Sequence, residues 1–135
     1  MELTGHHLIG DTTGAVGQET FQAQDPSSQA VLSPAFHEAT VSEVGMALRL
    51  GQECFDTFRA TTAENRAVFL EAIADEVMAL GDALLERAHQ ETGLPMARLT
   101  GERGRAVNQA KLFAGLIREG SWIDARIDLA LPDRQ

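Results

Sequence analysis

The chain has 135 residues, which is enough for one domain and not for two. Hydrophobic residues make up 44% and charged residues 23%, the balance of an ordinary globular protein, and no apolar run approaches the roughly 18 residues that span a bilayer. The net charge of −9, from 11 basic and 20 acidic residues, argues against nucleic acid and membranes as partners, because phosphate binding needs a basic surface.

Residues 1–39 are predicted to form a small β meander. Short β-like runs at His7–Ile9 and Glu19–Gln24 lie between turn signals. Asp25–Ser28 has turn chemistry, because proline presets φ and the Asp and Ser side chains can bond the backbone. Ala30–Ser33 is then expected to be the returning strand.

From Thr40 the hydrophobic period becomes helical. Thr40–Glu43 has the sequence of a capping box, and Thr61–Glu64 has that of a second one, so each is predicted to begin a helix. Each helix has one apolar face: Val44, Ala47, Leu48, Gly51, Phe55 and Phe58 in the first, and Leu70, Ile73, Ala74, Val77 and Leu80 in the second.

Gly81-Asp82 is predicted to break the second helix, since Gly weakens a helix interior and Asp can cap a new start. A short helix follows, and Gly93 with Pro95 is expected to end it. Pro95 can also sit in the first turn of a last helix, which Gly120 should stop.

The tail changes period once more. Apolar residues alternate with mostly polar ones from Ile123 to Leu131, which predicts a half-buried strand. The sequence contains no turn or return strand after it. An amphipathic strand without a neighbour suggests that the protein continues beyond this sequence.

Cys54 is the only cysteine, so an internal disulfide is excluded and a reducing, cytoplasmic compartment is expected. Cys54 lies beside the apolar stripe of its predicted helix, and a buried structural thiol is favoured over a nucleophile. The carboxylates Glu71, Asp75 and Glu76 are interpreted as part of a solvated helix face.

The other candidates also favour structural roles. Gly101–Gly104 lies inside a helical pattern, so it is not a phosphate loop, and its glycines are expected to let another backbone approach. Trp122 is predicted to be a packing anchor, and His6-His7 to be a solvated terminus. None of the four histidines has zinc-site spacing. We therefore predict no catalytic, cofactor-binding or metal-ligating residue in this chain.

An ordered set of short motifs resembles the aldehyde dehydrogenase superfamily. Glu91–Pro95 resembles its Glu-Thr-Gly-x-Pro element, and Asp25-Pro26 resembles the Asn-Pro turn after its first strands. The start of the chain and its ending from Gly120 to Arg126 look most like the α-ketoglutaric semialdehyde (2,5-dioxovalerate) dehydrogenase branch. Arg66 with Phe69-Leu70 and Ile73-Ala74 resembles an Arg-x-x-x-Leu-x-x-Ile-Ala helix of the family. Glu102 and Arg105 resemble a Glu and an Arg in the helix that follows it.

The resemblance implies an N-terminal fragment of an α/β fold, mostly α with short β-strands. Family members are several times longer, and their catalytic cysteine, glutamate base and nucleotide-binding residues follow this region. Cys54 does not lie in the Gly-Gln-x-Cys-type loop that carries the family nucleophile. By resemblance, residues 1–39 are a β meander, residues 40–120 are helices flanking the cofactor domain, and residues 121–135 begin an oligomerisation strand.

The resemblance also implies a reaction for the whole enzyme, which is the NAD(P)⁺-dependent oxidation of an aldehyde to a carboxylate. This chain alone is expected to be inactive, and to associate with itself or with a homologous full-length subunit. Two alternatives stay open at this point. One is a stand-alone helical protein-interaction module, and the other is a small-ligand pocket between the helices.

Overall fold

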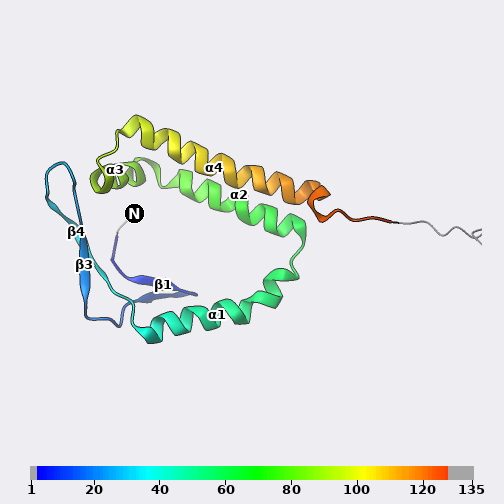
Figure 1. Cartoon of the computed structure of the whole chain (residues 1–135), viewed down its shortest axis with the longest axis horizontal. Coiled ribbons are helices and arrows are strands. Elements are labelled where there is room, and N and C mark those ends of the chain that lie inside the picture. The colour runs from blue at the N-terminus through cyan, green and yellow to red at the C-terminus, as the bar shows by residue number, and fades with distance from the viewer. Residues whose placement is uncertain (1–2, 128–135) are drawn as a thin grey trace, which may run out of the picture.

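The computed structural model describes residues 3–127 and is mostly helical with short strands (Figure 1), as predicted. Within these residues, four strands come first, and four helices and a 3₁₀ turn follow. Their bounds are β1 His7–Ile9, β2 Thr12–Gly14, β3 Thr20–Gln24, β4 Val31–His37, α1 Val41–Arg59, α2 Ala63–Ala79, α3 Gly81–Thr92, α4 Met96–Glu119 and the 3₁₀ turn η1 Ser121–Ile123.

The strands form two separate antiparallel pairs, β1 with β2 and β3 with β4. The predicted turn between β3 and β4 is confirmed: the Asp25 carboxylate accepts from the Ser27 amide at 2.7 Å and from the Ser28 hydroxyl at 2.8 Å. β4 runs further than the predicted Ala30–Ser33. The sequence reading missed β2, because Thr-Thr-Gly has no apolar alternation.

Local caps set the helix starts. In α1 the predicted capping box is confirmed, with the Glu43 amide donating to the Thr40 hydroxyl and the Thr40 amide donating to the Glu43 carboxylate. The second capping box was assigned wrongly. Thr62, not Thr61, caps α2 by accepting from the Asn65 amide at 3.1 Å, and Glu64 pairs with a distant arginine instead.

The predicted break at Gly81 is confirmed. Gly81 has φ +60°, in the left-handed region that suits glycine, and separates α2 from α3. Asp82 lies inside the first turn of α3 and does not cap it. The predicted ends at Gly93 and Gly120 are also confirmed, since both adopt left-handed conformations at the ends of their helices.

The core lies among α2, α3 and α4. Three of its six buried apolar residues are alanines, two on α2 and one on α4, and these let the two helices lie side by side (Figure 1). Arg87 on α3 connects this layer to β4, because it donates to the Ser33 carbonyl and lies over the Phe36 ring. The buried apolar residues are Ala67, Ala74, Leu85, Leu99, Val107 and Ala114.

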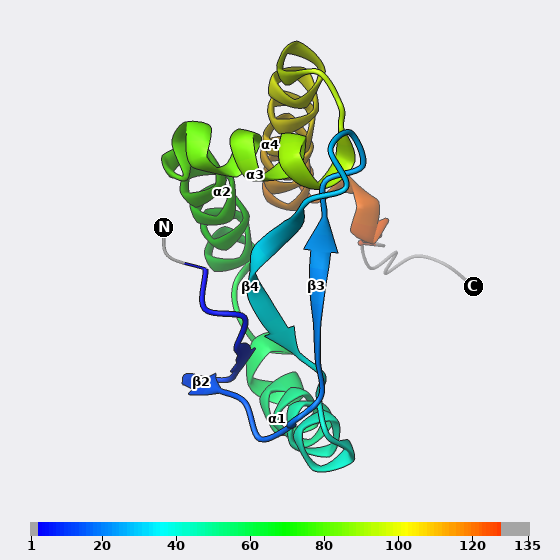
Figure 2. The same ribbon diagram turned by 90° about the vertical axis from the view of Figure 1, so that its left-hand side faces the viewer.

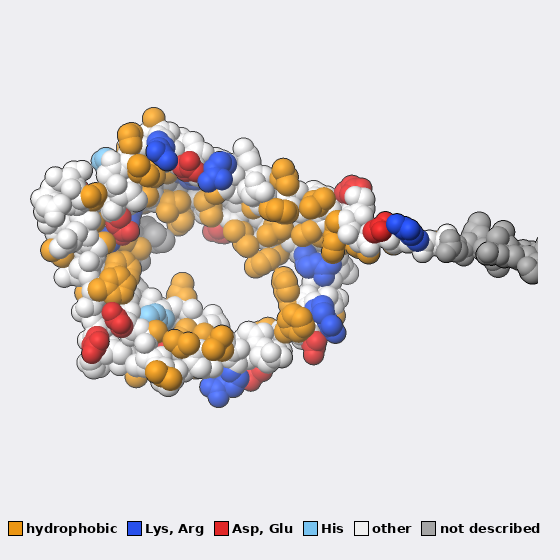
Figure 3. All heavy atoms as spheres, viewed as in Figure 1, with side chains coloured by type: hydrophobic (Ala, Val, Ile, Leu, Met, Phe, Trp, Pro, Cys, Tyr) orange, Lys and Arg blue, Asp and Glu red, His pale blue; other side chains and the backbone are white. Residues whose placement is uncertain are grey.

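The described elements enclose an opening. Figure 2 shows α3 at one end of the β3–β4 pair and α1 at the other, and α2 returns from α1 toward α3 (Figure 1). In the space-filling view, apolar side chains surround the opening (Figure 3). The predicted apolar stripe of α1 is uncovered by described residues: its largest members, Val44, Leu48, Phe55 and Phe58, are each at least 50% exposed.

The predicted tail strand is wrong over its described part. Ser121–Ile123 forms a 3₁₀ turn, and residues 124–127 have no regular secondary structure. A strand needs a neighbouring strand to accept and donate its backbone hydrogen bonds, and no described strand lies beside this segment. Residues 128–131 of the prediction lie outside the described residues.

Candidate functional site

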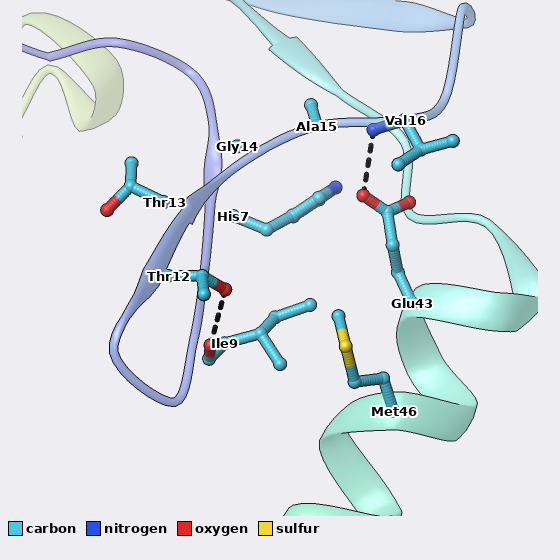
Figure 4. A pocket seen from close by; sticks show the side chains of 9 residues that line it. All are labelled: His7, Ile9, Thr12, Thr13, Gly14, Ala15, Val16, Glu43 and Met46. Carbon is cyan, nitrogen blue, oxygen red and sulfur yellow. Dashed lines mark hydrogen bonds between the residues drawn. The ribbon is translucent and has the colours of Figure 1, made fainter.

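The most buried polar side chain among the described residues is Glu43, in the first turn of α1. It is only 5% exposed. One carboxylate oxygen accepts from the Val16 amide, just after β2, at 2.8 Å. The other accepts from the amide and the hydroxyl of Thr40, each at 2.8 Å. Glu43 therefore both caps its own helix and fastens the β1–β2 hairpin to it (Figure 4).

These hydrogen bonds lower the pKa of Glu43 from 4.5 to about 2. The Thr40 amide contributes most, followed by the Thr40 hydroxyl and the Val16 amide, and a nearby imidazole, His7, adds a small attraction. A carboxylate with this pKa is ionised throughout the neutral range. The charge on Glu43 is thus a fixed feature of the hairpin contact.

Two hollows flank this carboxylate. The first has a volume of about 190 Å³ and lies against β1, β2 and α1 (Figure 4). The second has a volume of about 220 Å³ and lies against β1, the residue before Thr40, and α1. His7 and Glu43 line both hollows, and no other titratable side chain among residues 3–127 lines either one. The sequence prediction that His6-His7 is a solvated terminus is wrong for His7, because its Nε2 atom is buried and has no hydrogen-bond partner among the described residues.

A second cluster of charge joins the far ends of α2 and α4. The Arg118 guanidinium donates to Glu64 at 2.8 and 2.9 Å and to Glu71 at 2.6 and 2.8 Å. These bonds lower the pKa of both carboxyls and raise that of Arg118. Lys111 pairs with Asp75 at 3.2 Å on the same face. Two of the carboxylates singled out in the sequence thus hold helices together.

Three sequence expectations need correction. Cys54 is exposed and not buried, because the described residues leave its side of α1 uncovered. Trp122 is 54% exposed and anchors no strand. The glycines Gly101 and Gly104 face open space, since no atom lies within 4 Å of an added Cβ at either position. No described backbone therefore approaches them.

The described residues contain no match to the usual site of a dinucleotide or of a metal ion. Dinucleotides bind at the edge of a parallel sheet, whereas both described strand pairs are antiparallel. Over residues 3–127, no group of three or more His, Cys, Asp or Glu side chains is placed to hold a metal ion. Within the same residues, no helix is long and apolar enough to cross a membrane.

The sequence analysis did not predict the hydrogen bonds between residues that are far apart in the chain. Glu43 and Val16 are 27 residues apart, and Arg118 lies 54 residues from Glu64. No local pattern marks such partners. The capping box predicted the hydrogen bonds of Glu43 with Thr40 but not the one with Val16. For the Arg118 cluster, the sequence contained only opposite charges on two predicted helices.

Comparison with curated proteins places almost the whole chain within longer enzymes. Over 99% of its length it is 51% identical to α-ketoglutaric semialdehyde dehydrogenase 2 of Azospirillum brasilense. It is 39% identical to α-ketoglutaric semialdehyde dehydrogenase of Acinetobacter baylyi, again over 99% of its length. The chain spans about a quarter of both relatives, 26% of each.

Solved structures share the fold at lower identity. An NAD-dependent benzaldehyde dehydrogenase from Corynebacterium glutamicum superposes with a TM-score of 0.78 at 19% identity, covering 86% of this chain and 26% of that one. A betaine aldehyde dehydrogenase variant from Staphylococcus aureus, in complex with NAD⁺, gives 0.74 at 23% identity, covering 95% and 26%. The sequence pattern of the aldehyde dehydrogenase family matches residues 14–127. The chain therefore belongs to the aldehyde dehydrogenase family.

Proposed function

We propose that the chain is the N-terminal portion of an NAD(P)⁺-dependent dehydrogenase that oxidises α-ketoglutaric semialdehyde (2,5-dioxovalerate) to the dicarboxylate. The names of the two curated relatives support this substrate, since both are similar to this chain over 99% of its length. The alternative of a stand-alone interaction module is not favoured, because the family pattern extends over residues 14–127.

One structural observation carries the proposal that this chain is a portion of a larger enzyme. The apolar surface around the opening is left uncovered by the described residues (Figure 3). Exposed aromatic side chains also meet between α1 and α2, where Phe58 lies edge-on to Phe69 with ring centroids 6.2 Å apart. An apolar surface of this kind marks an interaction site. The partner that fits it is the remaining three quarters of the enzyme, which the relatives contain and this chain does not.

In the complete enzyme this chain would supply structure and no reacting group. The family reaction needs a cysteine thiolate to attack the aldehyde, a nicotinamide to take the hydride, and a base-activated water to release the acid. Cys54 is exposed on the surface of α1 and does not lie in the Gly-Gln-x-Cys-type loop that carries the family nucleophile. The helices α2, α3 and α4 would instead cover the cofactor-binding part of the enzyme.

The experiment compares the purified chain with the same chain fused to the remaining three quarters of the Azospirillum relative. We expect semialdehyde-dependent formation of NADH or NADPH by the fusion and none by the chain alone, because each missing catalytic group contributes orders of magnitude in rate. A control fusion lacks the catalytic cysteine of the relative's portion. Turnover by the chain alone, after removal of contaminating enzyme, would refute the proposal.

We also propose that the isolated chain associates with itself or with a homologous full-length subunit, and that it works in the cytoplasm. Its uncovered apolar surface supports the first statement and its single cysteine supports the second. Light scattering should give a mass above that of a monomer at micromolar concentration. A chain truncated after Gly120 tests the tail: if both are monomers, self-association is wrong.

A further inference from the structure

We propose that α1 pairs lengthwise with a second helix, and that a large apolar side chain of that helix fills a notch above Gly51. The second helix belongs to the remaining three quarters of the enzyme, so this inference rests on the proposed function and names the kind of partner that α1 takes. The surface that receives it, here called the α1 seam, consists of Val41, Val44, Leu48, Gly51, Phe55 and Phe58.

The spacing of the α1 seam is that of two helices packed along their length. Its members are separated alternately by three and four residues, which is the repeat of the a and d positions in a helix pair. The positions that border the middle of the seam are uncharged: Gly45 and Gln52 on one side, and Ala47 and Cys54 on the other. Since three of these four are small, a partner helix can approach α1 closely.

The described residues leave the α1 seam free. Leu48 is 71% exposed, and every other large member of the seam is at least half exposed. The β1–β2 hairpin docks on another side of the helix, where Glu43 accepts from the Val16 amide and Leu50 lies close to Gly10. The hairpin therefore leaves the seam to a different partner.

Gly51 makes a notch in the middle of the seam. The large side chains of Leu48 and Phe55 stand on either side of it, and no described atom lies within 4 Å of a Cβ added at Gly51. Glycine is disfavoured inside a helix, so the sequence gains nothing from this residue in the chain alone. In a helix pair each apolar side chain of one helix inserts between four residues of the other. A gap of this kind receives a large apolar side chain.

The size of the seam favours a partner in the same polypeptide. Covering its five large side chains would remove roughly 500 Å² of α1 from water, since a buried aromatic side chain alone accounts for about 150–250 Å². Counted on both partners, this is about 1,000 Å², below the roughly 1,200–2,000 Å² of stable interfaces between separate proteins. A linked helix needs less area, because its effective concentration is high. The relatives contain the additional chain from which such a helix can come.

The test compares Gly51→Leu with the matched variant Gly45→Leu, in the chain alone and in its fusion to the remainder of the Azospirillum relative. Both glycines lie inside α1, and an added Cβ meets no described atom at either one. In the chain alone, both variants should raise the midpoint of thermal unfolding by about 2–4 °C, because leucine favours a helix. In the fusion, Gly45→Leu should again raise the midpoint. Gly51→Leu should lower it by about 2 °C or more, because the notch is then overfilled.

Cys54 supplies a second measurement, since it borders the seam three residues after Gly51 and is the only cysteine of this chain. Its labelling by a thiol reagent is followed by mass spectrometry of the Cys54 peptide, which separates it from cysteines of the relative's portion. Labelling should be at least about tenfold slower in the fusion than in the dilute chain alone, because the partner helix covers this side of α1.

Three results overturn this inference and leave the proposed function standing. In an active fusion, one is a midpoint that rises in Gly51→Leu as it does in Gly45→Leu, and another is Cys54 labelling as fast as in the chain alone. The third is a Gly51→Leu variant that destabilises the chain alone, because the notch would then be filled without a partner. A fusion without dehydrogenase activity overturns both proposals, since the partner helix is assigned to that enzyme.

Discussion

Helix α1 and the α2–α4 pair are stabilised in two different ways. In α2 and α4, the alanines Ala67, Ala74 and Ala114 are at most 1% exposed, so the two backbones pack closely. In α1 the one buried residue is a charged one, Glu43, and no described residue covers the apolar stripe. The comparison shows that an amphipathic pattern and a strong cap suffice to specify a helix in this chain. Burial depends on what lies opposite.

The largest expected effect tests the packed side of this comparison. Ala114→Leu should lower the free energy of unfolding by about 1–3 kcal/mol, because the added atoms have no room between α2 and α4. The matched change Ala47→Leu, on the uncovered face of α1, should alter it by about 0.5 kcal/mol or less. Urea unfolding followed by circular dichroism measures both. Equal losses in the two variants would contradict the comparison.

Substituting two glycines by alanine tests separately how backbone conformation and packing contribute to the free energy of unfolding. Gly81→Ala should destabilise the chain by about 1–2 kcal/mol, because a Cβ is strained at φ +60°. Gly101→Ala should stabilise it by about 0.5–1 kcal/mol, since the helix interior favours alanine and nothing lies within 4 Å of the new Cβ. Thermal unfolding gives both signs. A loss of stability in Gly101→Ala would indicate that another backbone does pack there.

The N-terminal cap of α1 should contribute more to the stability of the chain than the uncovered apolar stripe of this helix. Thr40→Ala removes the hydroxyl that bonds the Glu43 amide and carboxylate, and should cost about 1 kcal/mol. Hydrogen exchange should show the loss in the first turn of α1. Thr40→Ser retains the hydroxyl and is expected to keep most of the protection. Equal hydrogen exchange of the first turn in the two variants would show that the Thr40 hydroxyl does not stabilise it.

The smallest effect is expected at Cys54. Because its side chain is exposed on α1, Cys54→Ala should change the free energy of unfolding by about 0.5 kcal/mol or less. A thiol reagent should label native and unfolded chain at similar rates. Labelling that is much slower in the native chain would mean that a partner, such as a second copy, covers this face.

The sequence allowed the family and most helix boundaries to be predicted, because their signals are local. Thr40 caps the start of α1. Gly93 and Gly120 end α3 and α4 because glycine adopts the left-handed conformation easily. The exposure of Cys54 could not be predicted in this way. Periodicity shows that a face is apolar, but burial of that face needs a second surface.

The charged contacts were the hardest part to predict. Residues 16 and 43, or 64 and 118, meet only after the chain has folded back on itself. The tail failed for a related reason: the alternation at Ile123–Ile127 is a genuine strand pattern, but a strand forms only beside another strand. The prediction that the chain contains no catalytic, cofactor or metal residue stays a prediction.

The uncovered stripe of α1 has a consequence for the order in which the protein is made. A ribosome releases the chain from its N-terminus, so the hairpins and α1 emerge before α2 and α4 exist. Phe55 and Phe58 then emerge before the later helices, and none of the described helices covers them. The same residues are thus open to wrong partners until the surface proposed to cover them has been made. Translation speed and molecular chaperones should therefore influence the yield of this chain more than its helix propensity does.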